Sequence, residues 1–411
     1  MTLWNPVWSV VIDGVEYSSV SLANLTIQSG RTDIYSQAVA GYLNISLINL
    51  DQSAIVPTIN STITVYVEDS TGTPKAIFGG SITDIIVTVQ STGAIALTQT
   101  VGIVALGALS RLPKVLTEGV LTQEYDGVQI YDVLDGILLG SWSQVAPTLT
   151  WAGYSATTTW AAAENNGLGE IDTGNYELTA RSSSVTDAYS LVAALATSGL
   201  GYIYENSAGQ ICYADSTHRS VYLTANGYVD LSANDALAIG LETAVRSGDV
   251  RNYVTLTYNN GAEVTASDST SIATYGALAQ NIDTTLKHTA DANSQANFYL
   301  TLRAYPRANF NSISYQLGSP ELSDSDRDSL INVFMGMPVN LTDLPINMGT
   351  AFQGFVEGWA FQAGYNSLSV SLYMTPIAYS LDAFRWNNVA SSERWNTLNP
   401  TLDWLNATIV A

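Results

Sequence analysis

Apolar and polar residues alternate one by one along much of the first quarter of this 411-residue chain. The pattern is clearest in residues 43–47 and 63–67, where Leu, Ile or Val occupies every second position. This period of two is typical of a β-strand with one buried face, because a helix would bring every third or fourth residue to the same side. Residues 8–14 predict a strand that ends in an Asp-Gly hairpin turn. We therefore predict a tube-like β domain, closed as a small barrel or sandwich, over residues 1–110.

A long apolar run at residues 77–87 predicts a further strand of this domain. Gly79 and Gly80 lie side by side within the run. Paired glycines inside a strand indicate a β-bulge or the close approach of another backbone.

Helical spacing replaces the alternation from about residue 112. Residues 126–139 carry apolar side chains on one helical stripe, namely Val128, Tyr131, Leu134, Ile137 and Leu138. Residues 184–187 read Ser-Val-Thr-Asp, which is typical of a helix start. The helix that follows is predicted to end at Gly199 or Gly201.

A short hairpin completes this middle segment. Residues 202–204 and 211–213 are predicted to pair across an Asn-Ser-Ala-Gly turn. We therefore predict a mixed α+β domain over residues 111–220. The single cysteine, Cys212, lies in this hairpin. It has no partner for an intrachain disulfide and is expected to be a small buried apolar residue.

Strand patterns return in the last third of the chain, at residues 253–258, 310–317, 352–361 and 368–374. Residues 271–306 predict a connector followed by a surface helix, and residues 323–330 predict a capped helical turn. We predict a second tube-like β domain with helical segments over residues 221–378.

The chain ends in a Trp-rich tail over residues 379–411. Arg-Trp-Asn occurs twice, around Trp386 and Trp395, and Trp404 follows at the same nine-residue step. Exposed aromatic side chains dock well on neighbouring molecules. Two alternatives remain open for these three residues: they dock on a partner, or they pack on their own domain.

The charge balance argues against strong binding of nucleic acid through its phosphate groups. The chain has 36 acidic and 14 basic residues, a net charge of −22, and only 12% of its residues are charged. Such a surface repels DNA, which would let DNA pass without sticking. The sequence start lacks the pattern of a secretory signal, and no apolar run is long enough to span a membrane.

The search for catalytic or ligand-binding motifs predicts none. His218 and His288 lack the spacing of metal ligands, and His218 is expected in a surface loop. Residues 324–328 resemble the opening of a calcium loop, but the required Gly and Glu are absent at its sixth and twelfth positions. An N-terminal helix turn is the better interpretation of these acids. We expect no catalytic residues, no enzyme activity, no cofactor and no metal.

Six short motifs, weak singly but ordered along most of the chain, carry a family resemblance. In the first half they are Gly30-Arg31 with Ala40-Gly41, Phe78-Gly79-Gly80 with Thr83-Asp84, and Gly201-Tyr202 with Tyr204, Gly209 and Arg219. In the second half they are Ser271-Ile272 with Tyr275-Gly276, Leu344-Pro345, and Phe355-Val356-Glu357-Gly358-Trp359 with Pro376. In this order they resemble the baseplate-hub-like tail hub, or minor tail, proteins of long-tailed (siphovirus-like) bacteriophages.

The resemblance implies a structural virion protein at the tail tip, assembled in the host bacterial cytoplasm. It implies a homotrimer in which two tube-like domains per chain give six similar positions, matching a hexameric tail tube. The implied partners are a distal tail or tail-tube ring protein, the tape measure protein, and other tail-tip or fibre proteins. DNA would meet the hub only in transit during ejection.

A carbohydrate- or receptor-binding tail-tip module is the alternative. Nine Trp and 23 Tyr residues provide rings on which sugars can stack. A cell-wall hydrolase is the third class, and the sequence lacks the acid or metal motifs that are usual for it.

Overall fold

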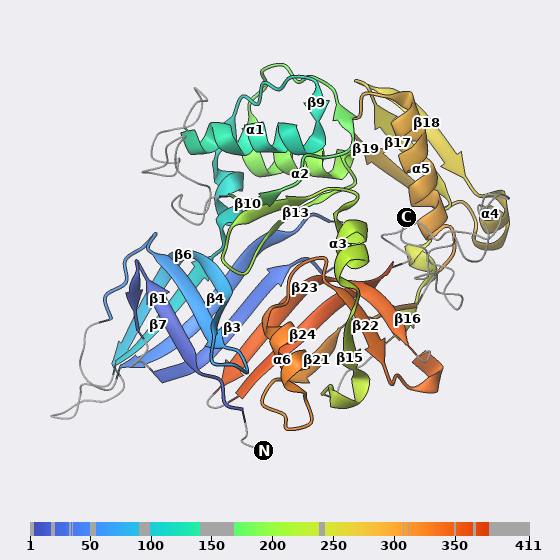
Figure 1. Ribbon diagram of the computed structural model, residues 1–411. Coiled ribbons are helices and arrows are strands. Elements are labelled where there is room, and N and C mark those ends of the chain that lie inside the picture. The colour runs from blue at the N-terminus through green and yellow to red at the C-terminus, as the bar shows by residue number, and fades with distance from the viewer. Residues whose placement is uncertain are drawn as a thin grey trace.

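The computed structural model describes residues 4–17, 21–32, 34, 36–49, 55–89, 99–139, 168–237, 243–306, 308–310, 312–348, 351–364 and 367–377. Figure 1 shows a large sheet in its lower half, with helices and short sheets above it. The predicted mainly β fold class is confirmed.

The N-terminal half of the large sheet is formed by β1 (Trp8–Ile12), β2 (Val15–Glu16), β3 (Ser21–Gly30), β4 (Val39–Asn49), β5 (Thr62–Glu68), β6 (Pro74–Val89) and β7 (Gln99–Leu106). Along β5 every second side chain is buried, as the alternation predicted. Asp13 and Gly14 form the predicted turn with φ angles of 48° and 77°. A two-residue hairpin turn with positive φ matches the twist of the strands it joins.

The C-terminal half of the sheet is formed by β15 (Val229–Ser232), β21 (Ile313–Gln316), β22 (Pro338–Thr342), β23 (Phe352–Gly364) and β24 (Ser367–Pro376). Helix α6 (Asp324–Ile331) packs beside β15, and two 3-10 turns, Ala233–Asp235 and Ile346–Met348, lie in the connections. The Ser323 hydroxyl caps α6 by accepting from the Asp326 N–H over 3.1 Å. The acids of residues 324–328 therefore form a helix start, as predicted.

The two halves join into one 12-stranded sheet because β3 pairs antiparallel with β23. Their buried side chains form a single core, in which Ile27 of β3 and Phe361 of β23 are fully buried. The expectation of closed barrels is wrong: among the described strands, the main path runs from β15 to β2 without closing. The physical reason is that β3 hydrogen-bonds to β4 on one side and to β23 on the other. The edge of β3 that a closed N-terminal barrel would need is therefore paired with the C-terminal half.

The segment above the sheet contains α1 (Asp126–Leu139), α2 (Ala188–Ser198), α3 (His218–Asn226) and the 3-10 turn Ala108–Lys114. Its strands are β8 (Leu116–Thr117), β9 (Glu124–Tyr125), β10 (Leu168–Ile171), β11 (Glu177–Leu178), β12 (Thr186–Asp187), β13 (Tyr202–Glu205) and β14 (Ile211–Ala214). Asp187 caps α2 through the Ser190 N–H, and Gly199 ends it, as predicted. The hairpin β13–β14 also forms as predicted and buries Cys212.

The buried stripe of α1 differs from the predicted one. Tyr131 is exposed, whereas Ile130 and Val133 are fully buried. Helix α2 packs against α1 (Figure 1). Ile130 and Val133 belong to the same buried core as Leu191 and Val192 of α2, and Tyr131 does not.

Residues 243–310 add a further segment. It contains β16 (Thr243–Val245), the 3-10 turn Ser247–Asp249, β17 (Tyr253–Tyr258), β18 (Ala262–Ser267), α4 (Ser269–Tyr275), β19 (Ala279–Asp283), α5 (Thr289–Arg303) and β20 (Ala308–Phe310). Of these elements, β17, β18, β19, α4 and α5 lie at the upper right of Figure 1, and β16 lies lower, near β22. The predicted surface helix is α5, which covers β17 and β18. Val254 and Leu256 of β17 share a core with α1 and α2 rather than with the large sheet.

Candidate functional site at the junction of the two sheet halves

The centre of the junction is one buried carboxylate, Glu357 on β23. Arg31 Nε donates to it over 2.7 Å, and the Thr375 hydroxyl donates over 2.6 Å. The two terminal nitrogens of Arg219 donate over 2.8 and 2.9 Å. Burial by itself would raise the pKa of Glu357, but Arg219 and Arg31 hold that pKa at about 2. A fully buried carboxylate with four charge-assisted or hydroxyl donors stays ionised.

A β-bulge directs Glu357 to this place. The register between β23 and β24 shifts between Val356 and Gly358, so Glu357 is the extra residue. Gly358 then lies opposite Gly30 at the end of β3. A Cβ atom on Gly30 would be 2.4 Å from the Glu357 carbonyl oxygen, and φ of Gly30 is +84°. Both constraints require glycine, because any other residue would force the strands apart.

Aromatic rings cover the two guanidinium groups. The Arg219 guanidinium lies 4.6 Å from the centre of the Tyr202 ring and 5.0 Å from that of Phe355. Arg31 lies 5.4 Å from the Tyr202 ring. These cation–π contacts partly replace the water that burial removes. The cluster therefore links β3, β13, α3 and β23, which come from all parts of the chain.

A second buried carboxylate, Glu205, fixes the β13–β14 hairpin to the N-terminal half of the sheet. It accepts hydrogen bonds from the Gly41 N–H over 2.7 Å and from the Leu109 N–H over 2.5 Å. Burial raises the pKa of Glu205 to about 7, against the lowering effect of these two bonds. Close to it, a Cβ on Gly79 would lie 2.2 Å from the Ala208 carbonyl oxygen. The predicted close backbone approach at Gly79 is thus confirmed, and the hairpin is its cause.

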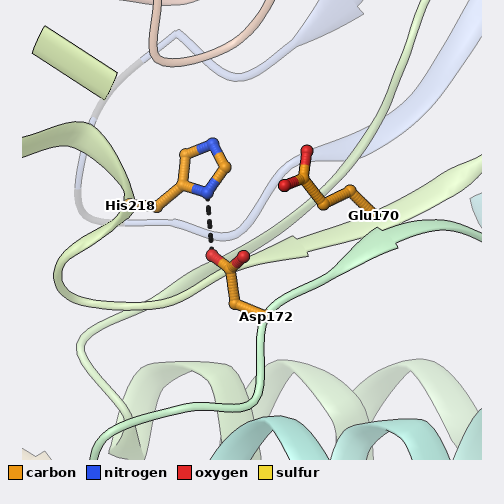
Figure 2. Close-up of side chains that lie close together, drawn as sticks. All are labelled: Glu170, Asp172 and His218. Atoms are coloured by element: carbon orange, nitrogen blue, oxygen red, sulfur yellow. Dashed lines mark hydrogen bonds and ion pairs between the residues drawn. The ribbon is translucent and has the colours of Figure 1, made fainter. Parts of the chain in front are cut away.

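A third polar cluster lies at the start of α3 and contains Glu170, Asp172 and His218 (Figure 2). His218 Nδ1 is 2.8 Å from Asp172 Oδ2, which also accepts from the Asp215 N–H over 3.0 Å. The hydrogen bond to Asp172 raises the pKa of His218, whereas burial opposes that shift. The Glu170 carboxylate points toward the imidazole ring in Figure 2.

The expectation of His218 in a surface loop is wrong. His218 is the first residue of α3, and its side chain is largely buried. The Asp215 carboxylate accepts from the N–H groups of Thr217 and His218, which turns the chain into the helix. His288 instead lies 2.6 Å from the Glu177 carboxylate, where it is half exposed.

The other predicted site residues cannot be placed. Trp386, Trp395 and Trp404, predicted to dock on a partner, lie outside the described residues. The buried Glu205 and the Glu170–Asp172 pair were not singled out by sequence reasoning. A usable signal for Glu205 is its position at the end of Tyr-Ile-Tyr-Glu, a strand without polar alternation and hence buried on both faces.

Two solved structures share the fold of this chain over almost their whole length. The tail protein from Neisseria meningitidis MC58 aligns with a TM-score of 0.58 at 11% sequence identity, covering 90% of this chain and 97% of that protein. The 43 kDa tail protein of prophage MuSo2 from Shewanella oneidensis aligns with a TM-score of 0.57 at 12% identity, covering 90% and 99%. This chain has a tail-protein fold. The resemblance indicated by the sequence motifs is therefore confirmed at the level of the fold.

Within this tail-protein fold, three of the motif residues meet at one point. Arg31, Arg219 and Glu357 belong to separate motifs, and they form the buried cluster described above. No protein-family model matches the sequence, and no curated protein matches it. In the described part of the chain, no helix is both long and apolar enough to cross a membrane.

Proposed function

We propose that this chain is a structural virion protein that forms a trimeric hub at the tip of a phage tail. The observation that carries the proposal is the coverage of the alignments: 90% of this chain matches 97% and 99% of two tail proteins. An alignment that covers 90% of this chain and nearly all of each tail protein extends well beyond any single segment of the fold. A likeness limited to one domain would be weaker support for a role in the tail than a likeness over nearly the whole chain.

The large sheet suits assembly into a closed ring. Its main path ends at β2 and β15, which lie at opposite ends of the strand order. Strands at the end of a sheet expose unpaired backbone groups that favour pairing with another chain. Contacts between opposite ends are head-to-tail contacts, which close into a ring when the rotation per copy is a simple fraction of a turn. Three copies, each with two sheet halves, would present six positions to a hexameric tail tube.

The proposed hub caps or continues the tail tube and provides the passage for DNA ejection. The net charge of −22 supports a bore that repels the DNA backbone, so DNA would pass without binding. The proposed neighbours are a distal tail or tube ring protein, the tape measure protein and other tail-tip or fibre proteins. Reversal of acids in the bore to Lys is expected to slow ejection.

The experiment that tests this proposal is mass measurement and negative-stain microscopy of the purified chain. We expect particles of three times the 43.9 kDa chain mass, with threefold symmetry and a central hole. A chain that stays monomeric at high concentration, and also when mixed with the tail-tube protein of the same phage, would contradict the hub.

A further inference from the structure

We propose that Glu170, Asp172 and His218 bind a divalent transition-metal cation of the zinc class. One ligand atom from each residue, a carboxylate oxygen or an imidazole nitrogen, lies within 4.8 Å of the other two. A zinc ion binds such atoms at about 2.0–2.2 Å, so two ligands on one ion are about 3–4 Å apart. Small rotations of the side chains in Figure 2 therefore bring all three onto one cation.

The backbone holds the three ligands in position before any cation binds. Glu170 lies in β10 and Asp172 directly follows that strand, and both carboxylates point toward the His218 ring in Figure 2. Asp172 is fixed by the Asp215 N–H, and His218 is fixed as the first residue of α3. Among the described residues, the Glu170 carboxylate makes no hydrogen bond or ion pair, so it can turn toward a cation without losing a partner.

The surroundings provide negative charge and an open coordination position. A cavity of about 530 Å³ is lined by the three ligands and by Asp215, Tyr204 and Thr217. The cavity lining thus carries three carboxylates and one imidazole, and a divalent cation would offset the repulsion between the carboxylates. Three protein ligands leave one position of a tetrahedral ion for water, which the cavity can hold.

The ligand types select the class of cation. Ca²⁺ and Mg²⁺ prefer sites built from oxygen ligands alone. An imidazole nitrogen together with carboxylates suits zinc and its neighbours among the first-row metals. Zn²⁺ is therefore the cation to test, with Ca²⁺ and Mg²⁺ as comparisons.

The consequence for the fold follows from the position of α3. Its first residue, His218, would bind the cation on β10, and its second residue, Arg219, is bound to Glu357 on β23. The cation would fasten α3 to the end of β10, while Arg219 fastens α3 to the large sheet. This inference does not depend on the proposed tail function, because it concerns one chain alone.

The test is isothermal titration of Zn²⁺ into the full chain after treatment with a chelator, with thermal unfolding measured in parallel. We expect one saturable site per chain and a rise in Tm on adding Zn²⁺, since a ligand that binds only the folded state stabilises it. Ca²⁺ and Mg²⁺ should give neither effect. X-ray absorption of the zinc complex should show one nitrogen ligand with oxygen ligands.

Two variants and a matched control make the test specific to this site. His218→Ala is expected to abolish binding, and Glu170→Gln is expected to weaken it by about tenfold or more. Glu170→Gln should fold normally, because its side chain is exposed and makes no hydrogen bond with the described residues. His288→Ala removes the other histidine, which is paired with Glu177, and should leave binding unchanged. Non-saturable heats, undiminished binding in Glu170→Gln, or binding lost only in His288→Ala would overturn the proposal.

Discussion

Arg31 and Glu357 are 326 positions apart in the sequence, yet Arg31 Nε donates to the Glu357 carboxylate over 2.7 Å in the buried interior. The Arg31 N–H also donates to the Glu357 carbonyl oxygen over 2.9 Å. Both bonds lie where β3 pairs with β23, so they close the seam between the two halves of the large sheet. This seam makes one sheet out of strands from both ends of the chain.

Replacement of Glu357 by Gln is expected to destabilise the chain strongly. The neutral amide leaves Arg31 and Arg219 buried without their counter-charge, and breaking such a buried pair costs about 3–5 kcal/mol. Denaturant unfolding of wild type and Glu357→Gln measures this loss. Glu177→Gln is the control, because Glu177 pairs with His288 at the surface, where water screens the ion pair and weakens its contribution to stability. Equal losses in both variants would contradict the role assigned to the buried cluster.

Glu205 is expected to make the stability of the chain depend on pH between about 4.5 and 7. Its folded pKa of about 7 lies above the ordinary value of 4.5. The folded state therefore keeps a proton that the unfolded state releases, and stability falls as pH rises through this window. The loss in unfolding free energy across this window is about 3 kcal/mol, and no further loss from Glu205 occurs above the folded pKa.

The measurement for Glu205 is unfolding free energy at a series of pH values from 4 to 8. Glu205→Gln cannot ionise, so its profile should be flatter than that of wild type between 4.5 and 7. Glu263→Gln changes an exposed carboxyl on β18 and should keep the wild-type profile. If the unfolding free energy of Glu205→Gln falls with pH as steeply as that of wild type, a group other than Glu205 causes the pH dependence.

Gly79→Ala is expected to disturb the contact between β6 and the β13–β14 hairpin. The new Cβ would lie 2.2 Å from the Ala208 carbonyl oxygen, and a backbone atom cannot swing aside as a side chain can. Overpacking of this kind costs about 1–3 kcal/mol. Gly102→Ala on the adjacent β7 is the control, because its nearest neighbour would be at an ordinary 3.6 Å. Thermal unfolding of both variants should show a loss for Gly79→Ala only.

Val15→Lys is expected to weaken assembly without changing the folded monomer. Val15 lies on β2 at one end of the sheet and is 54% exposed, where the proposed ring would bury it. A charge there must lose its water in the interface, which is costly. Sedimentation should shift from trimer to monomer, with an unchanged Tm for the dissociated chain. Val120→Lys alters a residue that is 61% exposed outside the sheet and should assemble normally; loss of assembly in both would argue against the sheet end as the contact.

Trp386, Trp395 and Trp404 remain predicted docking residues. Their joint replacement by Ala is expected to leave the trimer intact but to reduce capture of neighbouring tail proteins, because aromatic anchors supply much of the binding energy of interfaces. Co-purification from assembled tails measures this. If glycan binding by the purified chain is lost instead, the receptor-binding alternative gains support.

Local features of the sequence determined the individual elements. Period-two alternation identified β5, an Asp-Gly pair identified the first hairpin, and serine or aspartate caps identified the starts of α2 and α6. These features depend on residues a few positions apart, so they can be recognised without knowing the rest of the fold. The sequence motifs also contained Arg31, Arg219 and Glu357, but they did not predict that these three residues contact one another.

Only the tertiary structure decided how the elements combine. The local sequence of β3 does not predict that its free edge will pair with β23, because the backbone hydrogen-bonding groups are the same in every strand. The register of the pair is set by the core that both strands cover. This pairing replaced the expected closed barrels with one open path and brought Glu357 to Arg31. The start of α3 at His218 has a local cause, the Asp215 carboxylate that accepts from the Thr217 and His218 N–H groups, but only the tertiary structure brings His218 to Asp172. The sequence alone determined the elements, and long-range packing determined the junctions, since burial and charge pairing act only once distant segments meet.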